Sequence, residues 1–501
     1  MRDFRKFTNK NTFETDHLTN ASYPKLCIIE DTQKVHAQTN ISHFIAKYNV
    51  QTTTAATQVL GSAFDLTQIY KMYIDDVEIE PISSYTFTTT GEHTIKCEFL
   101  NLTTLAKCLS LCEYLTYFDG SNLDTSKVTT MLYTFQGCRN MTYCNVSTWD
   151  TSKVTSMERT WFCCEKVEYL DVSNFDTSNV TNMGCIFMAC YSLTNLDVSN
   201  WNTSKVTNMS RMFSQNKVTF PSGYVLNHMP MQLSKLDVSK WDTLNVTSFE
   251  SMFQNCPNLN YLDVSNWDTS NATDMRHMFN KCKNLCSLDV SNWDTSNVTR
   301  MTSLFQLCEN LCSLDVSNWD TSNVNDMSYM FSSCYNIKTI HGIENFNMSN
   351  VTTTYCMFSY CLSIEELILP NWNLSKCTTV GTMFQGMHHL DYIDICNINL
   401  QNCSNIEAMF NIYASTGESP TVDSAYDSQL REIRMDNVVP PTNNTSFLQI
   451  FDIPTTTKLY LPNAYKAKWQ SIIAQMIADH NNGVAGAGLT NILSESQIVW
   501  V

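Results

Sequence analysis

Six aspartates recur at one place in a repeated sequence, and each is followed two residues later by a serine. The aspartates are Asp171, Asp197, Asp237, Asp263, Asp289 and Asp315, and the serines are Ser173, Ser199, Ser239, Ser265, Ser291 and Ser317. A row of carboxylates could bind cations or a basic partner. On adjacent strands the carboxylates would repel one another, because like charges placed opposite each other destabilise a sheet. Serine hydrogen bonds, water, cations or a basic partner could offset that repulsion.

Two interpretations of this acidic row stay open. One is an acidic concave binding surface, with Ser265 and Ser291 beside the carboxylates. The plainer and favoured one is a solvated repeat consensus. Calcium is disfavoured because the chain lacks the Gly-rich ligand loop of a calcium repeat. We predict no metal site and no cofactor.

Cysteine is abundant, with 21 residues, and part of it falls at one place in the repeat. That column is Cys138, Cys164, Cys190, Cys256, Cys282, Cys308 and Cys334. It lies in register with apolar positions, and a free cysteine packs as a small hydrophobe. No Cys-x-x-Cys is matched by a second pair or by spaced histidines, as a zinc site requires. We therefore predict reduced, buried thiols rather than disulfides or metal ligands.

Nothing in the sequence has the pattern of a catalytic site. A nucleophile elbow, a P-loop and a metal-ligand cluster are all missing, so we predict that the protein is not an enzyme. His388 and His389, beside Asp391, fit a surface pair better than a metal site. A glycan depolymerase on a parallel β-helix is disfavoured, because its acid pair would interrupt the repeat, whereas here the acids belong to it. A column of tryptophans could stack sugars, but its register with buried columns favours the core.

The elements that must position these residues follow from the repeat. With the Leu of Leu-Asp-Val as position zero, most steps are 26 residues, one is 27 and two are 40. Position zero is occupied by Phe118, Cys144, Leu170, Leu196, Leu236, Leu262, Leu288, Leu314, Ile340, Leu367, Ile393, Ile433 and Leu459. Apolar positions 0 and +2 predict a short strand, and those from +10 to +23 follow a helical rhythm. Stacked turns would form a continuous core and a parallel sheet.

The two 40-residue steps each contain a 14-residue insertion after the aromatic residue at +17. They lie within 217–232 and 413–428. Their equal placement predicts that both leave the same edge of the solenoid. Loops on a rigid scaffold often bind ligands, which makes Tyr224, His228 and Tyr426 candidate contacts. A tolerated surface excursion is the alternative.

The repeat LDVSNWDTSNVTNM…MF…C resembles that of the BspA-like leucine-rich-repeat surface proteins, over about three quarters of the chain. Members occur in bacterial surface proteins, some protists and bacteriophages of gut bacteria. The resemblance implies a leucine-rich-repeat solenoid and a role in adhesion or protein binding. Residues 457–470 are similar to the closing strand and helix of that family, and residues 85–99 resemble the end of a β-sandwich module that precedes such repeats.

The expected fold is an α/β solenoid with a parallel sheet on one face, short helical segments on the other and a small β-rich N-terminal region. We expect an anchoring segment at 1–45, a β-sandwich-like module at 46–99 and a helical cap at 100–117. The solenoid should span 118–458, and a strand–helix cap should span 459–501.

Composition and termini suggest a setting for the protein. Its net charge of −17 makes nucleic acid an improbable partner. No signal peptide, wall anchor or membrane span is evident. Together with the thiols, this favours a phage virion protein that folds in a reducing cytoplasm and is released by lysis. We expect it to bind a host-surface protein or glycan, and other virion proteins through residues 1–99; a homo-oligomer is possible. A bacterial cell-surface adhesin is the alternative.

Overall fold

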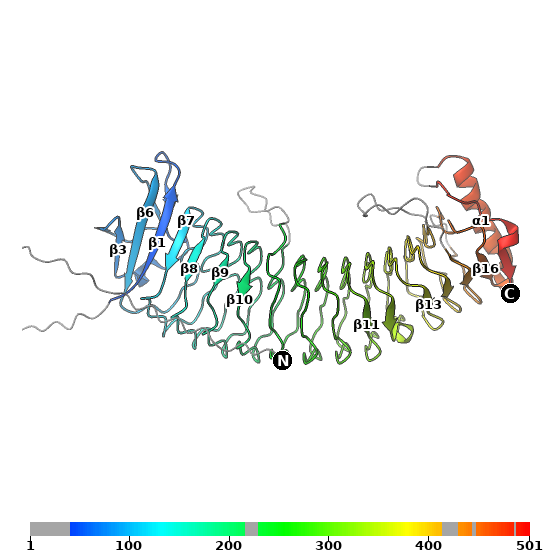
Figure 1. The fold of residues 1–501 in the computed structure, drawn as a ribbon, viewed down its shortest axis with the longest axis horizontal. Coiled ribbons are helices and arrows are strands. Elements are labelled where there is room, and N and C mark those ends of the chain that lie inside the picture. Colours follow the sequence, from blue (N-terminus) through cyan, green and yellow to red (C-terminus); the bar gives the residue numbers. More distant parts are fainter. Residues whose placement is uncertain (1–40, 216–228, 413–428, 443–446, 485–486) are drawn as a thin grey trace, which may run out of the picture. The chain divides into compact units, whose positions relative to one another are not determined.

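The repeats stack as turns of a solenoid (Figure 1) in a computed structural model that describes residues 41–215, 229–412, 429–442, 447–484 and 487–501. The strands of these turns are β7 (Leu115–Asp119), β8 (Tyr143–Asn145), β9 (Tyr169–Leu170), β10 (Asn195–Leu196), β11 (Ser313–Asp315), β12 (Thr339–His341), β13 (Glu366–Ile368), β14 (Tyr392–Asp394), β15 (Glu432–Arg434) and β16 (Lys458–Leu461). Neighbouring strands are parallel, and position zero of one turn faces position zero of the next. Leu314 pairs with Ile340 in this way, and Ile393 pairs with Ile433 across the second insertion. The predicted register and parallel sheet are confirmed.

A second ladder joins the turns on the return side. Parallel backbone bridges run from Thr130 through every turn to Asn405, at position +12 in the other turns and at +13 in the 27-residue turn. The step from Asn208 to Ser248 crosses the first insertion. The amide of Thr273 donates to the carbonyl of Thr247 at 2.9 Å, and equivalent bonds recur from turn to turn. Each turn is therefore tied to its neighbours by backbone hydrogen bonds on both sides, which makes a stiff support for surface side chains.

The return segments differ from the predicted helical ones in their local structure. The amide of Thr134 donates to the carbonyl of Met131 at 3.2 Å, whereas that of Tyr133 reaches Glu158 of the next turn at 3.0 Å. Tyr133 has φ 59° and Gly137 φ 74°, and equivalent residues of later turns also have positive φ. An α-helix requires φ near −63° at every residue. The segments are thus successive β-turns, which repeat apolar positions every three or four residues and so imitate a helical rhythm.

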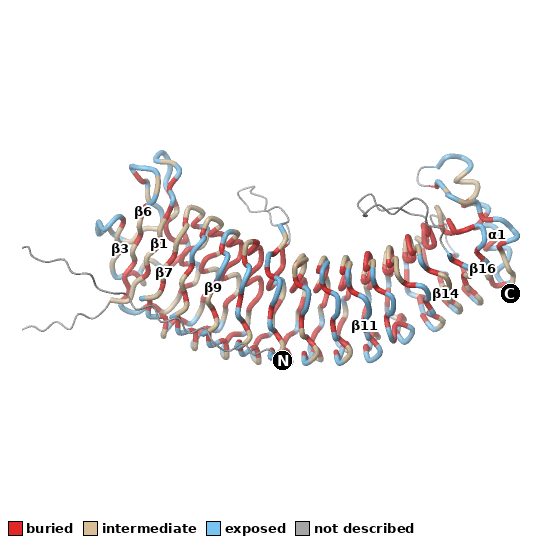
Figure 2. The backbone as a smooth tube through the Cα atoms, in the orientation of Figure 1, coloured by how far each residue is buried: buried red, intermediate tan, exposed pale blue. Residues whose placement is uncertain are grey.

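The residues of the apolar columns are buried in turn after turn of the stack, and Figure 2 shows buried positions in red along the described turns. Phe279, at +17, is fully buried and stacks on Phe253 and Phe305, with ring centroids 5.7 and 5.8 Å away. Trp267 and Trp293, at +5, are also buried, and each indole N–H donates to a valine carbonyl of the preceding turn, at 3.2 and 3.3 Å. The prediction that the tryptophans belong to the core is confirmed.

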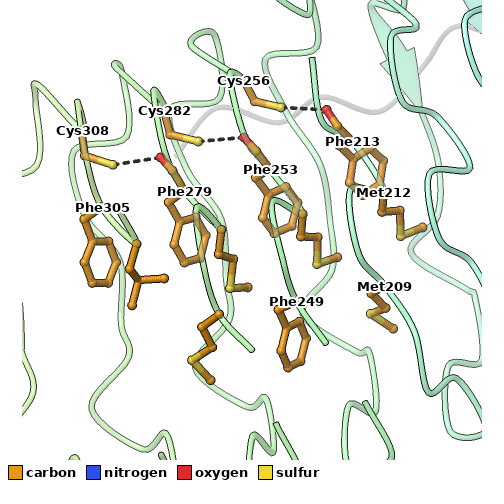
Figure 3. Packing of buried hydrophobic residues seen from close by; sticks show 14 of the residues in the cluster. Met209, Met212, Phe213, Phe249, Phe253, Cys256, Phe279, Cys282, Phe305 and Cys308 are labelled. Atoms are coloured by element: carbon orange, nitrogen blue, oxygen red, sulfur yellow. Dashed lines mark hydrogen bonds between the residues drawn. The ribbon is translucent and has the colours of Figure 1, made fainter. Parts of the chain in front are cut away.

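The cysteine column hydrogen-bonds as well as packs (Figure 3). The thiol of Cys282 donates to the carbonyl of Phe253, and that of Cys308 to the carbonyl of Phe279, both at 3.2 Å. Both side chains are fully buried, and burial raises the pKa of Cys282 to about 12. The predicted burial of this column is confirmed. The thiols of the column are protonated at neutral pH, so they can donate these hydrogen bonds.

The N-terminal strands extend the sheet of the solenoid. They are β1 (Ser42–Val50), β2 (Thr57–Gln58), β3 (Lys71–Ile74), β4 (Val77–Ile79), β5 (Ser84–Tyr85) and β6 (Gly91–Phe99), with the 3₁₀ turn η1 (Leu66–Gln68). One six-stranded sheet has the order β4-β3-β6-β1-β7-β8, and β1 is antiparallel to β7. Residues 42–99 therefore cap the first turn rather than form a separate sandwich. Of the predicted anchoring segment, residues 1–40 lie outside the described residues.

The predicted helical cap at 100–117 is wrong, because this segment is the first return of the solenoid. The amides of Leu105, Lys107 and Leu109 donate to carbonyls of the next turn at 2.8–3.1 Å. Such bonds leave the turn, whereas the amides of an α-helix bond within it.

The C-terminal end closes the stack with a strand, a helix and a strand. After β16 come η3 (Asn463–Tyr465), α1 (Lys466–Asn481), η4 (Glu495–Gln497) and β17 (Ile498–Trp500), which pairs parallel with β16. A further short turn, η2 (Ile343–Asn345), lies within the array. Helix α1 buries Trp469, whose ring lies 6.3 Å from that of Phe451. Among the described residues no helix is long and apolar enough to cross a bilayer.

Candidate binding surface

The solvent-facing side of the parallel sheet, here called the strand face, carries the predicted acidic row. Its side chains come from positions −1, +1 and +3, which flank the buried residues at 0 and +2. All six aspartates at +1 are exposed or half-buried. The alternation of a strand therefore places them where the sequence predicted, on the side away from the core.

Each aspartate is bonded to the serine two residues later. Oδ1 of Asp263 accepts from the backbone N–H of Ser265 at 3.2 Å and from its hydroxyl at 2.7 Å. The same pair of bonds joins Ser291 to Asp289, at 3.1 and 2.7 Å. These bonds favour the ionised carboxylate. Serine hydrogen bonding, one of the four ways of offsetting the repulsion named above, is therefore present in every turn of the row.

The hydrogen bonds also lower carboxyl pKa values. The Ser239 hydroxyl and amide hold the pKa of Asp237 below its ordinary value, and Ser317 does the same for Asp315. Both groups are thus negatively charged well below neutral pH. The strand face therefore presents anionic acceptors, and the bonds to the serines engage Oδ1 of each carboxylate.

Two shallow hollows gather the predicted aspartates. One is lined by Asp171, Asp197 and Asp237, with Tyr169 and Lys235 beside them. The other is lined by Asp263, Asp289 and Asp315, together with Ser265 and Tyr261. The first hollow spans three turns of the sheet, and the second spans three turns and reaches a fourth at His341. Together the two hollows contain all six aspartates of the row.

Exposed tyrosines at position −1, which were not predicted from the sequence, also lie on the strand face. Tyr143, Tyr169 and Tyr261 expose 45, 58 and 60% of their surface on the strand face. Tyr143 also stacks on Tyr117, with ring centroids 4.5 Å apart and planes 6° from parallel. The signal was present in the repeat, because tyrosine returns immediately before position zero in these turns. Exposed aromatic rings next to carboxylates can bind both an apolar and a polar part of a ligand.

The acidic row ends where the repeat is 27 residues long. His341 takes the aspartate position of that turn, and it lines both the second hollow and a larger one. The larger hollow is also lined by Lys338, Glu365, Glu366 and Ile368, the last of which is 44% exposed. The strand face therefore has two regions. One carries the acidic row, and the other combines basic, acidic and apolar side chains.

The remaining candidates are placed as follows. Tyr224, His228 and Tyr426 lie outside the described residues. Gln215 and Ile412, the last described residues before the two insertions, both occupy position +19. Asp391 is ion-paired with Arg431, so its carboxylate is engaged beside His388 and His389. Within the described part of the chain no three His, Cys, Asp or Glu side chains are grouped to hold a metal ion.

The profile of a family described as "Mycoplasma protein of unknown function, DUF285" matches residues 103–222, 225–341 and 311–421, which together exceed half of the chain. No curated protein matches the chain in sequence.

Three solved structures are similar to the chain at low identity. A leucine-rich-repeat protein from Bacteroides ovatus is 10% identical, over 83% of this chain and 90% of its own, with a TM-score of 0.30. One from Eubacterium ventriosum is 15% identical, over 58% and 77%, with a TM-score of 0.26. A structure of the TLR13–ssRNA13 complex is 12% identical, over 71% and 57%, with a TM-score of 0.19. On its repeat, its solenoid and the three family matches, the chain belongs to the DUF285 family, as a BspA-like leucine-rich-repeat protein.

Proposed function

We propose that the protein is a non-enzymatic adhesion protein whose strand face binds a host-surface protein or glycan. The observation that carries the proposal is the in-register row of bonded aspartates beside exposed tyrosines. Neither side chain type is needed by the core, which is built from positions 0, +2, +5, +10, +13, +17 and +20. Side chains that stacking does not require are free to serve a ligand.

The geometry suits recognition of an extended ligand. The two backbone ladders hold successive turns in fixed register, so little conformational entropy would be lost when a ligand binds. Hydrogen bonds to Ser265 and Ser291 fix the orientation of Asp263 and Asp289 before contact. Ionised carboxylates accept strong hydrogen bonds from hydroxyl or cationic groups, while Tyr143 and Tyr169 offer rings for stacking. Sugar chains and basic peptide segments both present such groups at short intervals.

We further propose that the protein is a virion component which meets the host surface as a phage attachment or decoration protein. The buried thiol column supports this setting. Thiols such as those of Cys282 and Cys308 serve as hydrogen-bond donors, and they are kept reduced in a cytoplasm. A cell-surface adhesin exported by a bacterium is the alternative. Mass spectrometry of purified phage particles and of washed host cells separates the two, since the chain should be found in the particles.

Binding is tested with the full chain on fixed gut bacteria and on a glycan array. We expect the triple variant Asp263→Asn, Asp289→Asn, Asp315→Asn to bind at least tenfold more weakly than the parent, a loss of about 1.4 kcal/mol. Asparagine keeps the Oδ1 acceptor for the serine, so only the charge is removed. The matched control is Asp268→Asn, Asp294→Asn, Asp320→Asn, which makes the same change at the +6 corner, where the aspartates also accept from the residue two further on.

The insertions are tested in the same assay. The variant Tyr224→Ala, His228→Ala, Tyr426→Ala removes the three contacts predicted there. If it abolishes binding while the strand-face variant binds as the parent does, recognition belongs to the insertions and the strand-face proposal fails. If the parent binds no cell and no glycan, the adhesion proposal itself fails.

A further inference from the structure

Two cysteines stand apart from the rest by their exposure. Among the described cysteines only Cys286 and Cys312 are exposed, whereas Cys356 and Cys396 are half-buried and the others are buried. Neither belongs to the column at +20 that donates to aromatic carbonyls. Both occupy position −2, just before the strand-face hollow that Asp263, Asp289 and Asp315 line. Packing, which accounts for the buried thiols, does not account for these two.

The two residues are direct neighbours in the stack. They precede Leu288 and Leu314 by two residues, and the backbone N–H of Cys312 donates to the carbonyl of Cys286 at 3.4 Å. The ladder continues on the far side, where Lys338 N–H donates to the carbonyl of Cys312 at 2.9 Å. In-register residues of parallel neighbours lie about 4.8 Å apart and point the same way. That spacing is within the range of about 4.4–6.8 Å between the Cα atoms of a disulfide.

Little holds the two thiols in their present orientation. Cys286 donates to the carbonyl of Asn260 at 3.7 Å, and Cys312 donates to that of Asn310 at 3.4 Å. The bonds of the buried column are shorter, as in Cys282 at 3.2 Å and Cys334 at 3.1 Å. Exposed side chains with weak bonds change rotamer easily, so either sulfur can turn toward the other.

We propose that Cys286 and Cys312 form an exposed dithiol site that a small-molecule disulfide, such as oxidised glutathione, converts into a covalent link between adjacent turns. One thiolate attacks a sulfur of the oxidant, which forms a mixed disulfide and releases one glutathione. The second thiolate then attacks the protein sulfur of that mixed disulfide and releases the second glutathione. Two electrons pass from the dithiol to the oxidant, and the two thiol protons go to the released glutathiones. This inference does not depend on the proposed binding function.

Among the cysteines that the structure describes, the link would form at one place only. The buried thiols of adjacent turns, such as Cys282 and Cys308, are also one turn apart, but burial denies them the oxidant and raises the pKa of Cys282 to about 12. A protein that leaves a reducing compartment would therefore gain a disulfide between Cys286 and Cys312, beside the second acidic hollow, while its buried thiols stay reduced.

The test treats the native full chain with oxidised glutathione at mildly alkaline pH, followed by alkylation and non-reducing peptide mass spectrometry. Cleavage after Lys283, Arg300, Glu309 and Asp320 places the two residues on separate peptides and separates Cys312 from both Cys308 and Cys334. We expect one linked peptide pair containing Cys286 and Cys312, lighter by two hydrogens than the two peptides together. The link should disappear on reduction.

Two variants make the result specific. With Cys286→Ser, Cys312 should carry one glutathione and form no internal link. With Cys286→Ser and Asn260→Cys together, two exposed thiols lie two turns apart, at about 9.6 Å, beyond the reach of a disulfide. That variant should carry two glutathiones and form no link. The proposal is overturned if the parent also carries two glutathiones, if its thiols do not react, or if they join separate chains instead.

Discussion

Removal of one buried ring tests the stacked core most directly. Phe279 lies between Phe253 and Phe305, at 5.7 and 5.8 Å, and its ring also lies 6.2 Å from that of Trp293. Truncation of a buried phenylalanine to alanine costs about 3–5 kcal/mol. Each aromatic pair adds about 0.5–1.5 kcal/mol beyond area burial. Because Phe279→Ala removes three such contacts, we expect a loss near the upper end, about 4–5 kcal/mol.

The architecture also predicts where that loss is felt. Each turn contacts only its neighbours, so the effect should be confined to nearby turns. A local loss of about 4.2 kcal/mol corresponds to roughly a thousandfold more frequent opening. Native-state hydrogen exchange should therefore show protection lowered by up to about a thousandfold in the turns of Phe253, Phe279 and Phe305. Amides in the distant turn of Phe384 should keep their protection.

Tyr261→Ala is the control for this prediction, because it removes from the same turn an aromatic ring that is 60% exposed. Surface changes of that kind usually alter stability by less than about 0.5 kcal/mol. If Phe279→Ala and Tyr261→Ala lower protection equally, the column at +17 is not the core of the stack. If protection falls uniformly from end to end, the turns are not independent neighbours and the nearest-neighbour reasoning is wrong.

Two further predictions concern a carboxylate and a glycine. Ser239→Ala removes the hydroxyl that lowers the pKa of Asp237. A carboxyl group whose pKa is lower in the folded state stabilises the fold above its unfolded pKa of about 4. This stabilisation is lost as the pH falls through the folded pKa. Denaturant unfolding should therefore show a lower free energy of unfolding for the variant than for the parent at pH 7, and this difference should shrink below about pH 4. A difference that does not change with pH would contradict this account. Gly342 has φ 84°, and an added Cβ would lie 2.2 Å from Ser317 Cα, whereas Gly483 has φ 64° and open space around it. In thermal unfolding, Gly342→Ala should lower the stability of the protein by more than Gly483→Ala, which should cost roughly 1 kcal/mol of left-handed backbone strain. Equal losses of stability would show that residue 342 does not approach Ser317 closely.

The periodic sequence predicted the stack because the same residue types return at each buried place. Leu314 and Ile340 were aligned by counting alone, and the pairing of β11 with β12 has that register. The tryptophans could be assigned to the core for the same reason. Counting shows only which positions are equivalent, however, and not which backbone conformation joins them.

What the sequence could not supply depends on backbone conformation and on distant pairing. Tyr133, Arg159 and His277 have positive φ, which is uncommon for residues of these types and is not signalled by them. The pairing of β1 with β7 joins residues about 70 positions apart, and no local pattern indicates it. Cys282 was correctly predicted to be buried, but apolar periodicity cannot distinguish a thiol that only packs from one that also donates a hydrogen bond.

The unbroken ladder at position +12 bears on how such a gene can change in length. The bonds between turns come from the backbone, so any two copies of the 26-residue unit present nearly the same surface to each other. The segments 287–312 and 313–338 share their first fourteen residues except for two. Insertion or deletion of whole 26-residue units would add or remove complete turns, and the chain would still have matching backbone donors and acceptors at the new junction. The length of the solenoid is thus set by the number of repeats, and it can change without any change in the chemistry of a single turn.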